Sequence, residues 1–176
     1  MSSNVFQKPY KTWPRTLRWP LEASVIVVVF VLLSSWLSRH MLETQSAAPV
    51  ARLTSLTGST IDLDWSGQPS SDTLLYFFAP WCGICRISMP GLGLIPRDNL
   101  QVYAVALDYD SPDQVKTFVR EVGFEGEVLL GNPTLRDQFQ IQGYPSYYVI
   151  DPNGNIQHRD QGFSTPPGLW LRTQSW

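Results

Sequence analysis

The sequence predicts an α/β fold, in which helices flank a mixed central sheet and one transmembrane helix precedes the folded domain. Two continuous apolar runs, 73–79 and 100–107, have the length and composition of buried central strands. Segments with helix-start signals separate these runs from later strands, and two short strands joined by a turn lie near the end of the chain. Such alternation is typical of a sheet with helices on both faces. An uncharged run at 23–37, rich in apolar residues, comes before all of these segments.

The first half of the domain begins with a predicted β-hairpin. Its strands, at 53–57 and 60–64, are separated by a Gly-Ser pair that favours a turn. After the central strand at 73–79, the chain is expected to enter a helix that meets Pro90. The next buried strand follows at 100–107.

The second half alternates between helices and strands. One helix is predicted from Pro112 to about Val122, because Ser111 can cap it, proline is favoured at the first helical position, and Gly123 ends it. Another begins at the Asn-Pro pair at 132–133 and runs to about residue 140. Short strands are predicted at 127–130, 146–150 and 155–161, with a turn at 151–154, and the tail from Pro166 is predicted to form a last short helix.

The N-terminal segment has the features of a signal-anchor. Residues 1–20 carry four basic and no acidic side chains, and Glu22 is the only charged residue in the span 21–38. About eighteen helical residues rise about 27 Å, which is just enough for the hydrocarbon core of a bilayer. The excess of basic residues before the span favours a cytoplasmic N-terminus.

These features divide the chain into four predicted parts. They are a cytoplasmic basic N-terminus (1–20), a transmembrane signal-anchor (21–38), a polar linker (39–52) and the folded domain (53–176). A buried core helix and a cleaved signal peptide are the alternatives to an anchor. The charge bias disfavours the first alternative, and Pro49, directly after small residues, disfavours cleavage. The domain is therefore expected in the periplasm, on an inner membrane that the chain crosses once.

Charge and cysteine content exclude several classes of protein. From Arg39 onward the chain has 9 basic and 14 acidic residues, and so acidic a domain lacks the basic face that nucleic-acid binding requires. The hydrophobic fraction of 43% is too high for a disordered chain. The two cysteines, Cys82 and Cys85, are too close in sequence to staple distant parts of a secreted scaffold. Chemical reactivity is therefore the more economical explanation of the pair.

Cys82 and Cys85 lie between a predicted buried strand and a predicted helix. A cysteine at the start of a helix faces unpaired backbone N–H groups and the positive end of the helix dipole. Both stabilise a thiolate, so the pKa of Cys82 is expected to lie below that of a free cysteine. A thiolate is the attacking species in disulfide exchange. The pattern predicts Cys82 as the nucleophile and Cys85, one turn further and deeper, as the resolving thiol.

Two other interpretations of the cysteine pair stay open. The cysteines could be inert structural thiols, or they could bind a soft metal ion such as Cu(I), with Met89 as a further ligand. A structural zinc site needs four ligands, and the two histidines of the chain lie far away in sequence. We predict no cofactor and no metal, with a Cu(I) carrier as the alternative function.

Two segments resemble the thioredoxin-like family. The run Phe-Ala-Pro-Trp-Cys-Gly-Ile-Cys-Arg at 78–86 resembles its active-site segment, and Pro90 falls where members of the family bend the active-site helix. The run Gln-Gly-Tyr-Pro-Ser at 142–146 resembles its Gly-x-Pro-Thr loop, whose proline is cis and faces the cysteines. The resemblance covers residues 50–165 and implies a thioredoxin-like fold with an added N-terminal hairpin. The predicted anchor and this hairpin look like the TlpA/ResA/DsbE branch, and most like protein disulfide oxidoreductases of the suppressor-of-copper-sensitivity D (ScsD) type.

The resemblance implies a docking surface around the cysteines. Trp81 would flank them, and Tyr144, next to Pro145, would offer its backbone to an extended substrate strand. These three residues are the predicted substrate-binding set.

Four further residues are predicted to support the site. Tyr76 stands where thioredoxin has a buried acid, and a phenol is a poor base near neutral pH, so core packing is its favoured role. Gly83 and Ile84 separate the cysteines, and an uncharged Ile84 implies a less oxidising site than that of relatives with a histidine there. Arg86 either stabilises the thiolate by its charge or is simply solvated.

The predicted function is thiol–disulfide exchange with partner proteins outside the cytoplasm, in the reducing direction. The predicted partners are substrate proteins with cysteine pairs, such as apocytochrome c or copper-handling proteins. A reducing role in an oxidising compartment needs electrons from the other side of the membrane. The resemblance implies a membrane thiol-shuttling reductant of the DsbD kind as their source.

Overall fold

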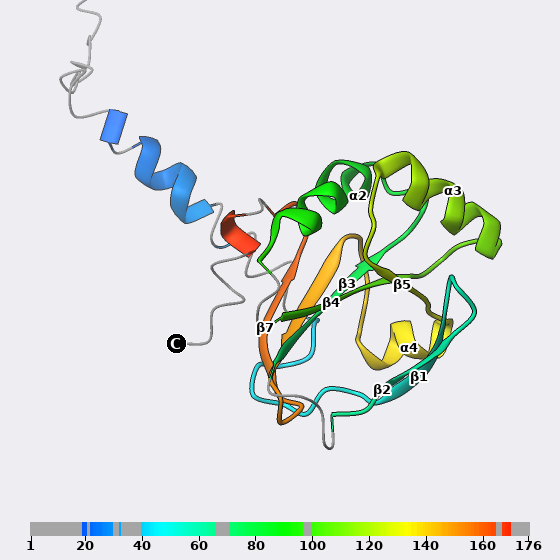
Figure 1. Ribbon diagram of the computed structural model, residues 1–176. Helices are drawn as coiled ribbons and strands as arrows, with labels where there is room; N and C mark the ends of the chain where they lie inside the picture. The colour runs from blue at the N-terminus through cyan, green and yellow to red at the C-terminus, as the bar shows by residue number, and fades with distance from the viewer. Residues whose placement is uncertain are drawn as a thin grey trace, which may run out of the picture. The chain divides into compact units, whose positions relative to one another are not determined.

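A computed structural model describes residues 19–20, 22–29, 32, 40–65, 71–96, 100–164 and 167–169. The chain divides into two units, 1–37 and 38–176 (Figure 1). In the first unit, residues 22–29 are helical. Among the described residues, none of the helices combines the length and the apolar character that a membrane span requires. Most of the predicted span 21–38 outside this stretch, and the predicted cytoplasmic segment up to residue 18, lie outside the described residues.

The second unit contains one seven-stranded mixed sheet with the strand order β2-β1-β5-β4-β3-β6-β7. β3 pairs with β4, and β4 with β5, in parallel, and the remaining neighbours are antiparallel. Its elements, in chain order, are β1 (Ala51–Ser55), β2 (Thr60–Leu63), β3 (Asp72–Phe78), α2 (Gly83–Ser88), the 3-10 helix η1 (Met89–Leu94), β4 (Leu100–Ala106), α3 (Pro112–Val122), β5 (Glu127–Leu130), α4 (Pro133–Gln138), β6 (Ser146–Ile150) and β7 (Ile156–Gln161). The predicted mixed sheet and its N-terminal hairpin are therefore confirmed.

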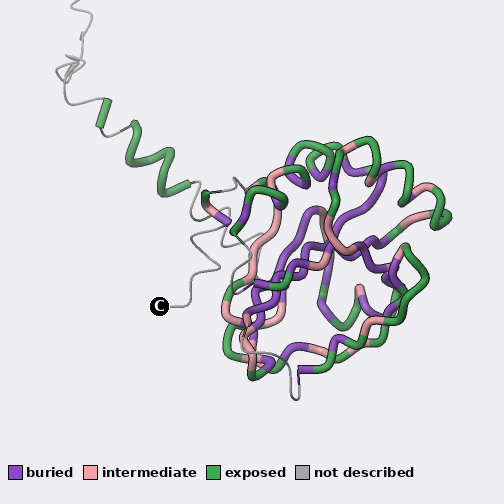
Figure 2. Tube along the Cα trace, in the orientation of Figure 1, coloured by how far each residue is buried: buried purple, intermediate pink, exposed green. Residues whose placement is uncertain are grey.

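Helices cover both faces of this sheet, as predicted (Figure 1). Every residue of β3 is buried, and alternate side chains point to opposite faces. Leu74, Tyr76 and Phe78 belong to a core shared with α2, η1 and α3, whereas Leu75 and Phe77 belong to a core shared with α4. Figure 2 shows the resulting buried centre of the sheet beneath exposed helix surfaces.

Local capping explains why the helices begin where the sequence predicts. The side chain of Ser111 accepts a hydrogen bond from Gln114 N–H at the start of α3. Gly123 ends that helix in a left-handed conformation, with φ of 64°. In the same way, Asn132 Oδ1 accepts from Leu135 N–H at 2.8 Å at the start of α4. α2 gives way to η1 at Met89, next to the predicted bend at Pro90.

The predicted linker 39–52 differs from the structure, because residues from 41 onward pack against the folded domain. Met41 and Ala48 are buried. The backbone of this segment pairs with β7 and the turn before it: Gln45 N–H donates to Ile156 C=O at 2.7 Å, and Ile156 N–H donates to Ser46 C=O at 2.9 Å. The domain therefore begins about ten residues earlier than the predicted boundary at 53, because backbone groups in this polar segment find partners on the β6–β7 hairpin.

Gly131, directly after β5, lies in a tightly packed position beside the C-terminal end of β4. A Cβ atom there would lie 2.7 Å from Leu107 Cδ2 and 2.9 Å from the carbonyl oxygen of Ala106. Since the backbone oxygen cannot move aside cheaply, Gly131→Ala is expected to lower the free energy of unfolding by about 1–3 kcal/mol. Urea denaturation measures this, with Gly93→Ala as the control, because a Cβ at Gly93 meets nothing within 4 Å. Equal stability of the two variants would contradict the prediction.

Candidate active site

The two cysteines lie at the junction between β3 and α2. A tight turn follows the end of β3, in which Cys82 N–H donates to Ala79 C=O at 3.0 Å. Cys82 is the N-cap residue of α2, and its Sγ accepts a hydrogen bond from Cys85 N–H at 3.1 Å. The two residues form a disulfide with their Cα atoms 5.3 Å apart. The predicted strand–cysteine–helix arrangement is therefore present.

The cysteines differ in their access to solvent. Cys82 is 7% exposed, whereas Cys85 is fully buried in the core beneath α2. This difference follows from the helix, because a residue three positions on turns inward toward the sheet while the N-cap stays at the rim. An incoming reagent can therefore reach Cys82 more readily than Cys85.

The loop before β6 carries the second predicted motif. The peptide bond between Tyr144 and Pro145 is cis. Two hydrogen bonds hold the loop: Gly162 N–H donates to Pro145 C=O, and Ser146 Oγ donates to Gly143 C=O, both at 2.8 Å. Pro145 itself is buried. The antiparallel pairing of β6 with β3 thus brings this loop to the end of β3 at which the cysteine motif begins.

Trp81 and Tyr144 join the two motifs. Their rings meet edge to face, with centroids 5.7 Å apart and planes at 81°. Trp81 is 64% exposed, so much of its indole remains available on the surface beside Cys82. The structure therefore brings together residues that lie about 60 positions apart in the sequence.

Asp108 is a member of this cluster that the sequence analysis missed. Its carbonyl oxygen accepts a hydrogen bond from Trp81 Nε1 at 2.9 Å, and its Oδ2 accepts from the Tyr144 hydroxyl at 2.9 Å. The missed signal was topological. β3 and β4 are parallel neighbours, so residues that directly follow β4 lie at the same edge of the sheet as the cysteine motif.

Tyr76 is buried beneath α2 and holds its proton. Its hydroxyl is 2.6 Å from Ser88 Oγ, and Ser88 Oγ donates to Ile84 C=O at 3.0 Å. Burial raises the pKa of Tyr76 to about 12, with the Ser88 hydrogen bond opposing part of the shift. Tyr76 therefore packs in the core, the role the sequence favours, and stays protonated near neutral pH. Its bond to Ser88 also anchors α2, which the sequence analysis did not predict.

Comparison with known proteins identifies the family. The profile of the AhpC/TSA family matches residues 44–159, about two thirds of the chain. The chain belongs to the AhpC/TSA family.

The individual relatives are thiol–disulfide interchange proteins and thioredoxin-like proteins. The chain is 29% identical to the thiol:disulfide interchange protein HelX of Rhodobacter capsulatus, over 65% of this chain and 66% of HelX. It is 40% identical to a thioredoxin-like protein of Haemophilus influenzae, over 65% of this chain and 56% of that protein. The chain thus spans just under two thirds of the first relative and just over half of the second.

A solved structure supports the same grouping. A crystal structure of a thiol:disulfide interchange protein DsbE of Chlorobium tepidum matches with a TM-score of 0.65 at 28% identity, over 74% of this chain and 95% of that one. The predicted thioredoxin-like fold is confirmed. Within the AhpC/TSA family, the chain is a thioredoxin-like member whose homologues include thiol–disulfide oxidoreductases.

The remaining predicted residues lie on the exposed side of α2. Gly83 and Ile84 are exposed between the cysteines, and Ile84 adds no charge there. Arg86 points to α3, where its Nη1 lies 2.7 Å from Glu121 Oε2 and its guanidinium lies over the ring of Phe118, 5.1 Å from the ring centre. Since Glu121 balances its charge, Arg86 joins α2 to α3, a role that the sequence analysis did not foresee.

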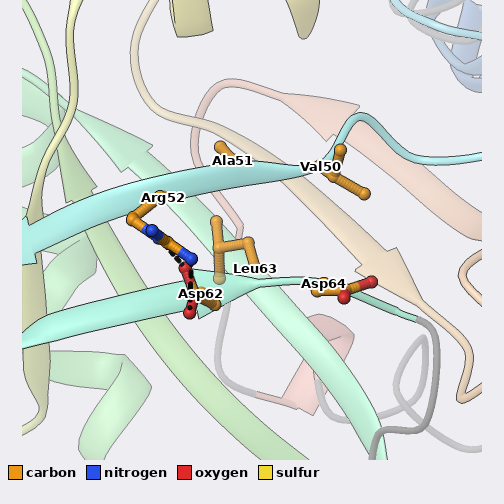
Figure 3. Close-up of a pocket in the computed structure, with 6 residues that line it drawn as sticks. All are labelled: Val50, Ala51, Arg52, Asp62, Leu63 and Asp64. Carbon is orange, nitrogen blue, oxygen red and sulfur yellow. Dashed lines mark hydrogen bonds and ion pairs between the residues drawn. The ribbon is translucent and has the colours of Figure 1, made fainter.

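Two surface hollows lie outside the cysteine junction, and neither is lined by Cys82 or Cys85. The larger, of about 480 Å³, lies at the β1–β2 edge, where Arg52 and Asp62 form an ion pair (Figure 3). Its lining residues are Val50, Ala51, Arg52, Asp62, Leu63 and Asp64. The smaller, of about 420 Å³, lies beside the Arg86–Glu121 pair between α2 and α3. The larger hollow is lined by none of the predicted site residues, whereas Arg86 lines the smaller one.

Met89, the suggested third Cu(I) ligand, is fully buried in the same core as Cys82 and Cys85. Across the described part of the chain, His, Cys, Asp and Glu side chains form no group of three or more that could hold a metal ion. A copper site would therefore combine the sulfur of Cys82 at the rim with the two buried sulfur atoms of Cys85 and Met89.

The Tyr76 hydroxyl can be tested by removing it alone. Tyr76→Phe is expected to lower the free energy of unfolding by about 1 kcal/mol near neutral pH, because the bond to Ser88 is lost. The pKa in the folded protein, about 12, lies above the ordinary value of 10.0. The phenol therefore stabilises the fold fully below pH 10, and this contribution is lost as the pH rises to about 12. Denaturant unfolding across this range should show a smaller alkaline loss in the variant than in the wild type, and parallel losses would contradict the assignment.

Proposed function

We propose that this chain is a membrane-anchored, extracytoplasmic thiol–disulfide oxidoreductase that reduces disulfides in partner proteins. One observation carries the proposal. Cys82 Sγ lies at the first turn of α2 and accepts a backbone hydrogen bond from Cys85, at the rim of a surface formed by Trp81 and Tyr144. A sulfur atom held by a backbone donor is suited to carry negative charge.

In the first step, the Cys82 thiolate of the reduced enzyme attacks one sulfur of a substrate disulfide. A new bond forms between Cys82 and that sulfur, and the substrate's own S–S bond breaks. The leaving sulfur departs as a thiolate and takes a proton from solvent. The substrate is then joined to the enzyme by a mixed disulfide.

In the second step, the Cys85 thiolate attacks Cys82 Sγ and releases the substrate's second sulfur as a thiolate. Two electrons have then passed to the substrate, which leaves as a dithiol, and the enzyme holds the Cys82–Cys85 disulfide. The order of attack follows from burial, because Cys85 is fully covered and Cys82 is not. A dithiol reductant must reduce the enzyme before another cycle.

The proposed substrate-binding residues are Trp81, Tyr144 and Pro145. Among the described residues, neither backbone group of Tyr144 has a backbone hydrogen-bond partner. An extended substrate segment can add hydrogen bonds at such an unpaired position. The exposed indole of Trp81 supplies apolar area beside it.

The reducing direction rests on the electrostatics around the sulfurs. Ile84 places no charge near Cys82, so the reduced state gains no added charge stabilisation from this position. We propose membrane thiol-shuttling reductants of the DsbD kind as the electron source, because an oxidising compartment cannot supply the electrons. Apocytochrome c and copper-handling proteins are the proposed substrates, and the ScsD type is the proposed subgroup.

Cys85→Ser tests the mechanism directly. Without the resolving thiol, Cys82 is expected to remain joined to its substrates, so non-reducing gels should show high-mass species that dithiothreitol removes. Mass spectrometry of these species identifies the substrates. Cys82→Ser is the matched control, because it retains only the buried cysteine and should trap far less.

The same variants decide between exchange and copper carriage. If Cys85→Ser traps no partner while the wild type binds Cu(I) tightly under anaerobic competition, the carrier function replaces the proposed one. Met89→Leu then reports whether the buried thioether contributes, since leucine conserves the volume of the core.

The location of the domain is part of the proposal. It rests on the apolar span 21–38 and on the excess of basic residues before it. A reporter enzyme that is active only in the periplasm, fused after Trp176, is expected to be active. Activity from a cytoplasm-specific reporter at the same position would reverse the proposed orientation.

A further inference from the structure

Asp108 lies where three separate elements meet. It follows β4 by two residues, at the edge of the sheet from which the cysteine motif also leaves β3. Its backbone is left-handed, with φ of 48°. Such a conformation is uncommon for residues other than glycine and is best tolerated by asparagine and aspartate. The turn therefore directs both the carbonyl and the carboxylate of Asp108 toward neighbouring elements.

Each polar group of Asp108 binds a different partner. The carbonyl oxygen accepts from Trp81 Nε1 at 2.9 Å, and Oδ2 accepts from the Tyr144 hydroxyl at 2.9 Å. Oδ1 accepts from Nη1 of Arg136, on α4, at 3.2 Å. One residue thus ties the cysteine motif, the cis-proline loop and α4 together.

The electrostatics favour this arrangement, in which Arg136 pairs with both Asp108 and Asp137. Arg136 balances the Asp108 carboxylate, although both side chains are more than a third exposed, so the ion pair alone is weak. Burial raises the pKa of Tyr144, and the hydrogen bond to Asp108 and its charge raise it further. The Tyr144 hydroxyl therefore remains a donor to Asp108 over the whole range in which thiol–disulfide exchange operates.

We propose that Asp108 is a positioning residue for disulfide exchange, which holds Trp81 and Tyr144 in their edge-to-face contact and so fixes the surface that a substrate polypeptide meets beside Cys82. The proposal rests on the proposed exchange function. It adds a specific consequence: Asp108 matters for substrates that extend over the Trp81–Tyr144 surface more than for small disulfides that reach only the sulfur.

The test uses Asp108→Gly in the full-length protein. Glycine accepts the left-handed backbone and keeps the carbonyl that binds Trp81, so the side chain is lost while that backbone contact is retained. Asp110→Gly is the control, because Asp110 is an exposed acid two residues away whose carboxylate accepts a hydrogen bond from Gln114. Two probes are compared with the reduced enzyme: glutathione disulfide, and a short synthetic peptide with one internal disulfide.

The readout is the ratio of the second-order rate constant for the peptide to that for glutathione disulfide. Asp108→Gly is expected to lower this ratio about fivefold, because only the longer substrate contacts the Trp81–Tyr144 surface that Asp108 orders. The loss should lie mainly in the rate constant for the peptide. Asp110→Gly should keep the wild-type ratio. An unchanged ratio overturns the proposal, whether both rate constants fall equally, which indicates a purely structural role, or neither falls.

A double-mutant cycle with Tyr144→Phe isolates the proposed contact. That change removes only the hydroxyl that donates to Asp108 Oδ2. If the two residues act through this bond, the double variant should lower the ratio no further than the more severe single variant. Fully additive losses would overturn the assignment. Should Asp108→Gly fail to fold, Tyr144→Phe and Asp108→Asn give the same comparison, and the asparagine variant is expected to fall between wild type and Tyr144→Phe.

Failure of the underlying function has a different signature. If the reduced wild type reacts with neither probe although Cys82 can still be alkylated, disulfide exchange itself is excluded. If the wild type reacts with both probes and only the predicted change in ratio is missing, the exchange function stands and the role of Asp108 falls.

Discussion

The burial of β3 on both faces is the constraint on which the rest of the domain depends. All seven residues of this strand are buried, and the strand is flanked by β4 and β6. Because no backbone group of a central strand can be left unpaired cheaply, its register with both neighbours is strongly fixed. The turn at its end therefore presents Cys82 at a defined height above the sheet. The same pairing places the loop at Tyr144 and the residue Asp108 at that edge.

The sequence predicts this domain well wherever a local signal decides the structure. The strands at 127–130 and 146–150 have the predicted bounds, and α3 starts and ends as its serine cap and glycine stop indicate. The cysteine junction is also predictable, because a strand, a reactive pair and a helix follow one another directly in the chain. Each of these features depends on interactions within a few residues.

Features that depend on tertiary contacts are the ones that sequence analysis misses. Residues 41–48 are polar enough to suggest a linker, yet their backbone groups pair with the β6–β7 hairpin more than 100 positions away. Asp108 has no local pattern that marks it, and its role arises because parallel strands end at a common edge. Arg86 likewise gains its partners, Glu121 and Phe118, only when α3 packs beside α2. In each case the missing information is a spatial neighbour, not a property of the residue.

The two outer strands of the sheet, β2 and β7, influence whether the protein aggregates at high concentration. An uncovered edge strand offers free N–H and C=O groups that can pair with another chain and seed aggregates. β2 carries Asp62, held in the ion pair of Figure 3, and β7 carries His158, Arg159 and Asp160 in succession. Pairing of another chain with β2 would strip water from the Arg52–Asp62 ion pair, whereas at β7 residues 45 and 46 already occupy the backbone groups of Ile156. Under the proposed exchange function, the domain would engage polypeptides at its cysteines with less risk of joining their sheets at its edges.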